Sequence, residues 1–210
     1  MQCTMNRSGA LLAVLALAVA LLASAAATAE EFSSQYTSAD VKKCRKFDRL
    51  VVAGDEIAAS WACPGVAGYL VVVSEDDLRT TVSVGKTTKA AGNEPVASER
   101  FGPFNFSYET VEWRSVKGAK TPFAIIQRWN ISDNANPTKE GRPGRAPLLI
   151  VTRLPPGPVC RVAFVDAGAN KEPNVLARRA ADELARDFRC GKDEVRIIGE
   201  RGRAIELAKD

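Results

Sequence analysis

Four of the five cysteines in this chain follow residue 29, and Cys44, Cys63, Cys160 and Cys190 restrict the folds that it can adopt. An even number of cysteines in a chain bound for an oxidising compartment indicates a disulfide framework. Four cysteines allow three pairings, and each pairing requires different segments of the chain to meet. Local geometry favours Cys44 with Cys63 and Cys160 with Cys190.

The first 29 residues have the composition of a bacterial signal peptide. A short polar start precedes the apolar run ALLAVLALAVALLASAA, and ATA at 27–29 supplies small residues before Glu30. We therefore predict cleavage after residue 29, which also removes Cys3 and leaves residues 30–210 as a single globular domain in the periplasm or the medium. The alternative is a transmembrane anchor, which the small residues at the end of the run disfavour.

The pairing of Cys44 with Cys63 follows from a predicted β-hairpin. RLVVA and IAASWA flank GDE at residues 54–56, and glycine and aspartate are turn residues. A turn centred near residues 54 and 55 places Cys63 opposite about residue 46, and a bulge or a chain end can supply the remaining two-residue adjustment. The alternative is a reactive thiol at Cys63, but no CxxC spacing and no histidine would activate it.

The pairing of Cys160 with Cys190 follows from a strand and a helix that returns along it. VCRVAFVDA alternates as a strand, and residues 176–188 in PNVLARRAADELARDFRCG carry apolar side chains at i+4 spacing. Pro173 and Gly191 bracket this helix. Because about 16 helical residues rise about 24 Å and a seven-residue strand covers about 20 Å, the returning helix brings the two cysteines together.

Most of the remaining chain has strand patterns. GYLVVVS, RTTVSVG, PFAIIQRWNI and PLLIVTRL are rich in β-forming residues, and FNFSYETVEWRSV alternates with a phase slip that a bulge near Thr110 explains. The predicted fold class is therefore α+β: a mainly antiparallel sheet with one long helix near the C-terminus packed on it, braced by two disulfides. Two long connections, 86–104 and 133–147, are the candidate functional loops.

The sequence contains no histidine, which removes the usual general base of Ser-His-Asp and Cys-His catalysis and the commonest zinc ligand. SVGKTT at 83–88 lacks the first glycine of a phosphate-binding loop, and the S-x-x-K spacing of Ser83 and Lys86 lies in a strand-like segment. We therefore expect no cofactor, no metal and a function without catalysis. The alternative is a hydrolase or transferase that uses carboxylates such as Asp76 and Asp77.

The second long connection carries the candidate ligand-binding residues, Lys139, Arg142 and Arg145. Their cationic groups could pair with phosphate or carboxylate groups of an envelope polymer or a partner protein. The alternative is a solvated, flexible loop. After cleavage 28 basic and 25 acidic residues remain, and this formal charge of +3 is too small to indicate a nucleic acid partner.

The segments SWACPGVAGYLVVVSEDDLRTTVSVG, YTSADVKKC, CRVAFVDAGAN and ARDFRCG resemble uncharacterised exported proteins of alphaproteobacteria, over nearly all of the chain after residue 29. The resemblance implies a compartment and no assigned activity. We predict a non-enzymatic periplasmic domain, without a membrane anchor after cleavage, that binds an anionic envelope component or another protein. A third hypothesis, inhibition of a cationic host hydrolase such as lysozyme, is disfavoured by the slightly basic charge.

Overall fold

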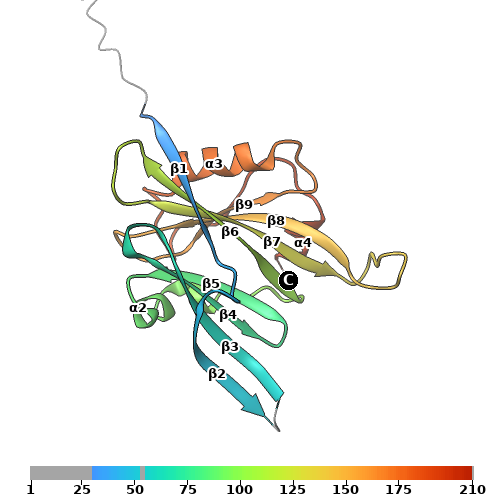
Figure 1. The fold of residues 1–210 in the computed structure, drawn as a ribbon. Helices are drawn as coiled ribbons and strands as arrows, with labels where there is room; N and C mark the ends of the chain where they lie inside the picture. Colours follow the sequence, from blue (N-terminus) through green and yellow to red (C-terminus); the bar gives the residue numbers. More distant parts are fainter. Residues whose placement is uncertain (1–29, 53–54, 210) are drawn as a thin grey trace, which may run out of the picture. The chain divides into compact units, whose positions relative to one another are not determined.

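The computed structural model describes residues 30–52 and 55–209, and in this part of the chain ten strands form two sheets (Figure 1). The six-stranded sheet has the order β1 (Phe32–Ser38), β6 (Asn105–Val116), β7 (Ala124–Asp133), β8 (Gly144–Arg153), β9 (Arg161–Asp166) and β10 (Arg196–Ile197). The four-stranded sheet has the order β2 (Arg45–Val52), β3 (Asp55–Pro64), β4 (Leu70–Asp76) and β5 (Arg79–Gly85). All neighbouring strands are antiparallel except β9 and β10, which are parallel.

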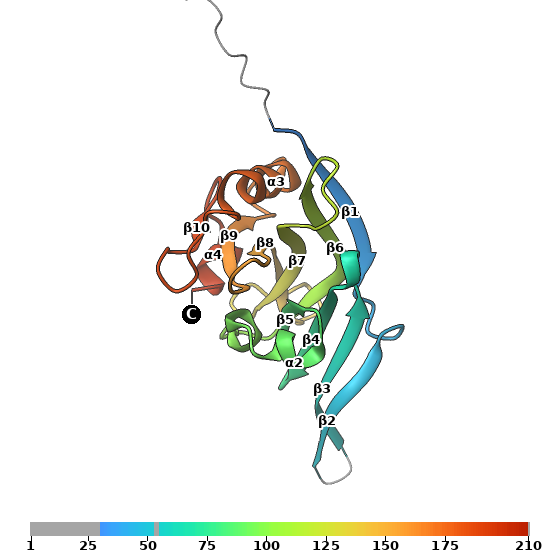
Figure 2. The same ribbon diagram turned by 90° about the vertical axis from the view of Figure 1, so that its left-hand side faces the viewer.

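The larger sheet is covered on both faces, as Figure 2 shows. Helix α3 (Pro173–Leu184) packs on one face, while the smaller sheet and α4 (Arg203–Leu207) pack on the other. Alternate residues of β7 therefore enter different cores: Ile125 and Trp129 face the smaller sheet, and Ile126 faces α3. Burial on both faces is the reason that these strands contain consecutive apolar residues, AII at 124–126 in β7 and LLIV at 148–151 in β8.

The predicted fold class, an α+β domain with mostly antiparallel sheets and two disulfides, is confirmed. The helix prediction matches only loosely. Within the described residues there are three α-helices, and α3 ends at Leu184 instead of continuing to Cys190. Beyond α3 the chain is held against the sheet, because Arg153 donates a hydrogen bond to the Phe188 carbonyl and Cys190 bonds to Cys160.

The Cys44–Cys63 disulfide forms as predicted, with the two Cα atoms 4.7 Å apart. The ladder of β2 and β3 pairs Arg45 with Ala62, so the two cysteines lie across from each other. The expected turn near residues 54 and 55 lies partly outside the described residues. In the described ladder Val52 pairs with Asp55, and two register shifts between these strands offset each other. The adjustment of two residues that the sequence suggested is therefore not needed.

The Cys160–Cys190 disulfide also forms as predicted, with a Cα–Cα distance of 5.9 Å. It joins the segment before β9 to the segment after α3 and so closes the β9–α3 unit. Two disulfides are typical of proteins in an oxidising compartment.

The predicted signal peptide, residues 1–29, lies outside the described residues. Within the described residues no helix is long and apolar enough to cross a membrane.

The two connections that we expected to be long loops are partly ordered. Residues 86–104 contain α2 (Thr88–Gly92) and the 3-10 turn η3 (Pro95–Ser98), and the Ser83 hydroxyl donates a 2.6 Å hydrogen bond to the Ala91 carbonyl. In the second connection β7 continues to Asp133 and β8 starts at Gly144, so only residues 134–143 connect them. These ten residues project beyond the sheets at the β7–β8 end in Figure 1.

Candidate binding site

Three aromatic side chains lie exposed in a row at the start of β6. Phe104, Phe106 and Tyr108 retain 40%, 41% and 36% of their accessible surface, and the rings of Phe106 and Tyr108 are 5.2 Å apart. We call these three residues the aromatic row. Large exposed apolar side chains that lie next to one another mark an interaction surface more often than scattered ones do.

The row lies on the face of the sheet that carries α3. Phe106 pairs with Asn130 and Glu112 pairs with Ile126, so even-numbered residues of β6 share this face both before and after the register shift between Ser107 and Val111. Val111 and Trp113 lie on the opposite face and are fully buried in the core. The bulge that the sequence predicted near Thr110 is present as this register shift, but it does not bring the aromatic residues to the same face as Val111 and Trp113.

A strained turn extends the apolar surface beside the row. Asp77 and Leu78 connect β4 to β5, and both have positive φ angles, 50° and 58°. Leu78 is 59% exposed and lines a hollow of about 270 Å³ together with Phe104 and Phe106. A leucine in the left-handed region is unfavourable, and hairpin turns of this kind prefer glycine, so an exposed leucine here suggests a role other than stability.

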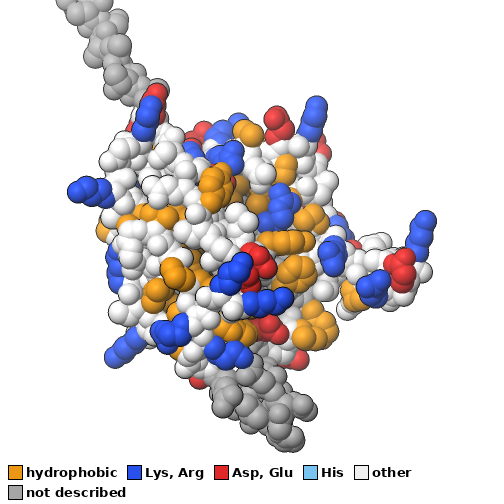
Figure 3. All heavy atoms as spheres, in the orientation of Figure 1, with side chains coloured by type: hydrophobic (Ala, Val, Ile, Leu, Met, Phe, Trp, Pro, Cys, Tyr) orange, Lys and Arg blue, Asp and Glu red, His pale blue; other side chains and the backbone are white. Residues whose placement is uncertain are grey.

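The β7–β8 connection forms the wall of a second hollow of about 420 Å³, which we call the hairpin hollow. It is lined by Phe106, Asn130, Ser132, Thr138, Glu140, Arg142, Pro143, Gly144 and Arg145. Figure 3 shows hydrophobic side chains on this face of the molecule next to the projecting connection, with Lys and Arg side chains beside them. The hollow thus combines an aromatic ring with cationic and uncharged polar groups.

Two of the three predicted binding residues lie together in this hollow, and one does not. Arg142 and Arg145 line it, and among the described residues neither has an acidic partner. Lys139 belongs to the same connection but is not one of the lining residues. The two arginines are therefore available to a ligand, and Lys139 serves as a nearby comparison.

Asn130 supplies the polar feature of the hollow that sequence reasoning missed. It lies in the middle of β7, is only 2% exposed and lines the hairpin hollow, yet its Oδ1 atom is buried without a hydrogen-bond partner. A buried oxygen without a partner costs about 1–3 kcal/mol, and such atoms in native proteins require an explanation. A ligand that donates a hydrogen bond to Oδ1 would supply the missing partner.

The base of the β7–β8 connection is held rigidly by Asp133. Its carboxylate accepts hydrogen bonds from the Ala135 backbone N–H at 3.1 Å and the Asn136 side-chain amide at 2.7 Å, and it pairs with Arg203. These donors, Arg203 first, hold the pKa of Asp133 well below its usual value. At the other end Gly144 lies against the Asn136 carbonyl, where a Cβ atom would have no room.

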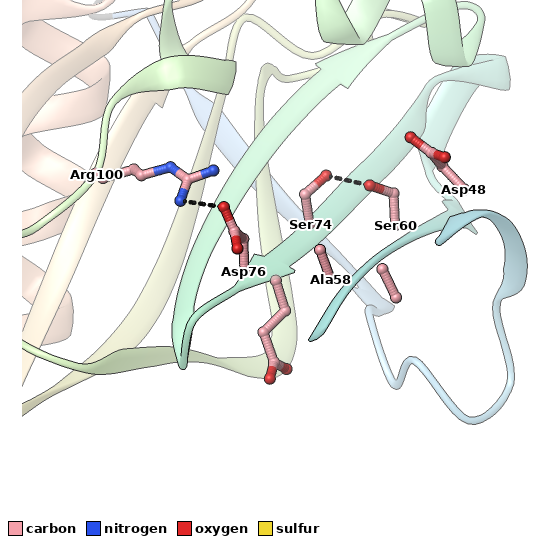
Figure 4. Close-up of a pocket in the computed structure, with 8 residues that line it drawn as sticks. Asp48, Ala58, Ser60, Ser74, Asp76 and Arg100 are labelled. Atoms are coloured by element: carbon pink, nitrogen blue, oxygen red, sulfur yellow. Dashed lines mark hydrogen bonds and ion pairs between the residues drawn. The ribbon is translucent and has the colours of Figure 1, made fainter. Parts of the chain in front are cut away.

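The carboxylates that an alternative enzyme would use do not face one cleft. Asp76 lines a separate hollow on the smaller sheet and pairs with Arg100 at 2.9 Å, as Figure 4 shows, while Asp77 pairs with Arg79 at 2.5 Å. Both side chains are largely exposed, at 45% and 75%. Asp48 and Glu75 also line the hollow of Asp76, but Asp77 does not, so Asp76 and Asp77 do not act together on one substrate.

Within the part of the chain that the structure describes, no three His, Cys, Asp or Glu side chains are grouped so that they could hold a metal ion. Ser83 and Lys86, which have the S-x-x-K spacing, both have structural partners: Ser83 is buried against α2, and the Lys86 ammonium lies 3.8 Å from the centre of the Tyr69 ring.

Comparison of the chain with known protein families, with curated proteins and with solved structures found no match. The chemistry of the hairpin hollow is therefore the basis of the proposed function.

Proposed function

We propose that this protein is an exported, non-enzymatic binding domain and that the hairpin hollow, with the aromatic row beside it, is its binding site. The observation that carries the proposal is the meeting of three features in one hollow. Arg142 and Arg145 have no acidic partner among the described residues, Phe106 exposes its ring, and Asn130 has a buried oxygen without a partner. Each feature is unfavourable or unused in the protein alone.

The arginines indicate that the ligand carries an anionic group. A guanidinium presents a planar fork of donors that matches a carboxylate or a phosphate, and such charge-assisted hydrogen bonds are stronger than neutral ones. Aromatic and arginine side chains together are also the residues most enriched at binding hot spots. We therefore propose an anionic component of the bacterial envelope as the ligand.

The proposed location is the periplasm. The pattern of residues 1–29 supports export, and the two disulfides are consistent with an oxidising environment. An envelope ligand would be present in this compartment, which agrees with the slightly basic charge of the domain.

Cosedimentation of the purified protein with isolated bacterial envelopes tests the proposal. We expect the double variant Arg142→Ala/Arg145→Ala to lose most of its binding, because both guanidinium groups that face the hollow are removed. Lys139→Ala is the matched control: it removes a cation from the same connection but not from the hollow, so its binding should equal that of the wild type. All three proteins should melt at the same temperature, since these side chains are not in the core.

Three results would contradict the proposal. The wild type could fail to cosediment, the double variant could bind as well as the wild type, or its melting temperature could fall by many degrees. The last result would show that the arginines stabilise the fold instead of contacting a ligand.

A further inference from the structure

We infer that the hairpin hollow binds an acidic saccharide, a sugar polymer in which a carboxylate is carried on the sugar ring. This inference rests on the proposed function and names the ligand class for the same site. It follows from one juxtaposition: Phe106, whose ring is exposed, Asn130, whose buried Oδ1 has no partner, and Arg142 and Arg145, unpaired among the described residues, all line a hollow of about 420 Å³.

Asn130 favours a ligand that donates a hydrogen bond. Its Oδ1 atom can only accept, so a fully ionised group such as a carboxylate or a phosphodiester would leave it unsatisfied. A sugar hydroxyl can donate to this oxygen and accept from another group at the same time. The hydroxyl of Ser132, which also lines the hollow, can serve as either partner.

Phe106 requires a ligand with a flat apolar face. Its ring is 41% exposed, and the Tyr108 ring lies beside it at an interplanar angle of 50°. The face of an aromatic ring is electronegative, whereas the C–H bonds on one side of a sugar ring point partially positive hydrogens outward. Stacking of a sugar on the Phe106 ring therefore combines apolar contact with a favourable electrostatic interaction.

The charges in the hollow favour one carboxylate per sugar over a densely charged polymer. Arg142 and Arg145 contribute two positive charges, and Glu140, which also lines the hollow, contributes one negative charge. The resulting net charge of +1 on the hollow matches a sugar ring that carries one carboxylate. The carboxylate of Glu140 can accept from further sugar hydroxyls, but it would repel a chain of phosphates.

A peptide fits this place less well, because the strands below the hollow have no free edge. Asn130 is paired with Phe106 of β6 on one side and with Pro147 of β8 on the other. A peptide therefore cannot add to the sheet through its backbone, which is how extended peptides commonly bind β-sheets. Saccharide hydroxyls do not need a free strand edge, and the polar side chains that line this hollow can pair with them.

The surface beyond the hollow suggests that the ligand is an oligomer. Phe104 and Ser132 line a further hollow of about 420 Å³, and Phe104, Phe106 and Ser132 line the hollow of about 270 Å³. Both hollows share Ser132 with the hairpin hollow, so the three hollows are neighbours beside the aromatic row. Successive sugar units can therefore contact successive rings.

Isothermal titration calorimetry of the oxidised protein, purified from the periplasm, tests the inference with three probes of similar length: oligogalacturonate, a neutral maltooligosaccharide and tetraglutamate. We expect oligogalacturonate to bind at least about tenfold more tightly than either of the others, a difference of about 1.4 kcal/mol. Phe106→Ala and Arg145→Ala should each weaken this binding about tenfold, and Lys139→Ala should leave it unchanged. Phe106 and Arg145 are used because substitution of the buried Asn130 could disturb folding.

Equal or tighter binding of tetraglutamate or of the neutral sugar would overturn the inference, as would no binding of oligogalacturonate. The envelope experiment distinguishes failure of the saccharide assignment from failure of the proposed function. If the wild type binds envelopes through Arg142 and Arg145 but not oligogalacturonate, the saccharide assignment fails and the proposed function stands. If neither assay shows binding that depends on these arginines, both fail.

Discussion

The carboxylate of Asp133 and the guanidinium of Arg203 meet through two hydrogen bonds, Nε to Oδ2 at 2.8 Å and Nη2 to Oδ1 at 2.9 Å. This pair joins the end of β7 to the start of α4, 70 residues later in the chain. Because Ser132 of the hairpin hollow immediately precedes Asp133, the ion pair also fixes the floor of the proposed site. The geometry of the hollow thus depends on contacts that do not themselves face a ligand.

The Asp133–Arg203 pair makes the stability of the protein sensitive to acid. The pKa of Asp133 is lowered in the folded state, so its contribution is fully present above the unfolded value of about 3.8 and is lost as the pH falls toward the folded pKa. We expect the free energy of unfolding, measured by urea denaturation, to decline below about pH 4. In Asp133→Asn the free energy of unfolding should decline less with falling pH, because only other carboxylates such as Asp193 still become protonated. Parallel declines in both proteins would show that Asp133 does not titrate as described.

Trp113 and Thr37 form a hydrogen bond that joins the core to the edge strand β1. The Trp113 side chain is fully buried, and its Nε1–H donates to the Thr37 hydroxyl at 2.8 Å. Thr37→Val keeps the shape but removes the acceptor, so we expect a loss of about 1–3 kcal/mol in the free energy of unfolding. Thr37→Ser is the control, since it retains the hydroxyl. If both variants lose the same free energy, packing of the methyl group matters and the hydrogen bond does not.

Arg161 lies buried among three aromatic rings, with its guanidinium carbon 4.3 Å from the centre of the Phe101 ring and about 6 Å from those of Trp129 and Phe164. Burial lowers its pKa to about 10, although Glu99 opposes this shift. Arg161→Lys keeps the charge but loses the planar stacking surface, so we expect the free energy of unfolding to fall by about 1–2 kcal/mol. Arg100→Lys, at an exposed ion pair, should change it by less than about 0.5 kcal/mol. Similar losses in the two variants would argue against a specific contribution of the rings.

The turn residue Leu78 provides a test that separates stability from binding. Leu78→Gly creates the Asp-Gly sequence that such hairpin turns prefer and relieves the positive φ of 58°, so we expect the melting temperature to rise and the free energy of unfolding to increase by about 0.5–1 kcal/mol. Binding to envelopes should fall, because the exposed leucine beside Phe104 is removed. A stabilised variant with unchanged binding would exclude Leu78 from the interaction surface.

Much of the fold could be predicted because its signals are local. The spacing of Cys44 and Cys63 about a turn, and the strand and helix between Cys160 and Cys190, were sufficient for both disulfides. The division into two facing sheets was not predicted, since it depends on which strands pair over long distances. The apolar character of both faces of β7 and β8 was its only local sign.

The candidate site was only partly visible in the sequence. Arg142 and Arg145 stand out in a connection rich in proline and glycine, and the alternation of Phe104, Phe106 and Tyr108 was evident, but alternating aromatic residues in a strand normally face a core. They share a face of the sheet with Glu112 and Ile126 but remain exposed, and alternation along the strand alone does not show this. Asn130 gives no local signal, because its missing partner becomes apparent only when the strands on both sides are in place.

The two disulfides should contribute separately to stability. They enclose chain segments with sequence separations of 19 and 30, and in the chain-entropy model each such loop lowers the entropy of the unfolded chain enough to stabilise the fold by about 3 kcal/mol. We expect Cys44→Ala/Cys63→Ala and Cys160→Ala/Cys190→Ala each to lose about 2–4 kcal/mol in the free energy of unfolding, measured by urea denaturation under non-oxidising conditions. The losses should add in the quadruple variant, because the bridges lie in different parts of the fold and share no partner. Addition of a reducing agent should lower the stability of the wild type and leave the quadruple variant unchanged. A quadruple variant as stable as the wild type would show that packing of the two sheets and α3 suffices to hold the fold. Complete reduction of the wild type without any loss of stability would show the same.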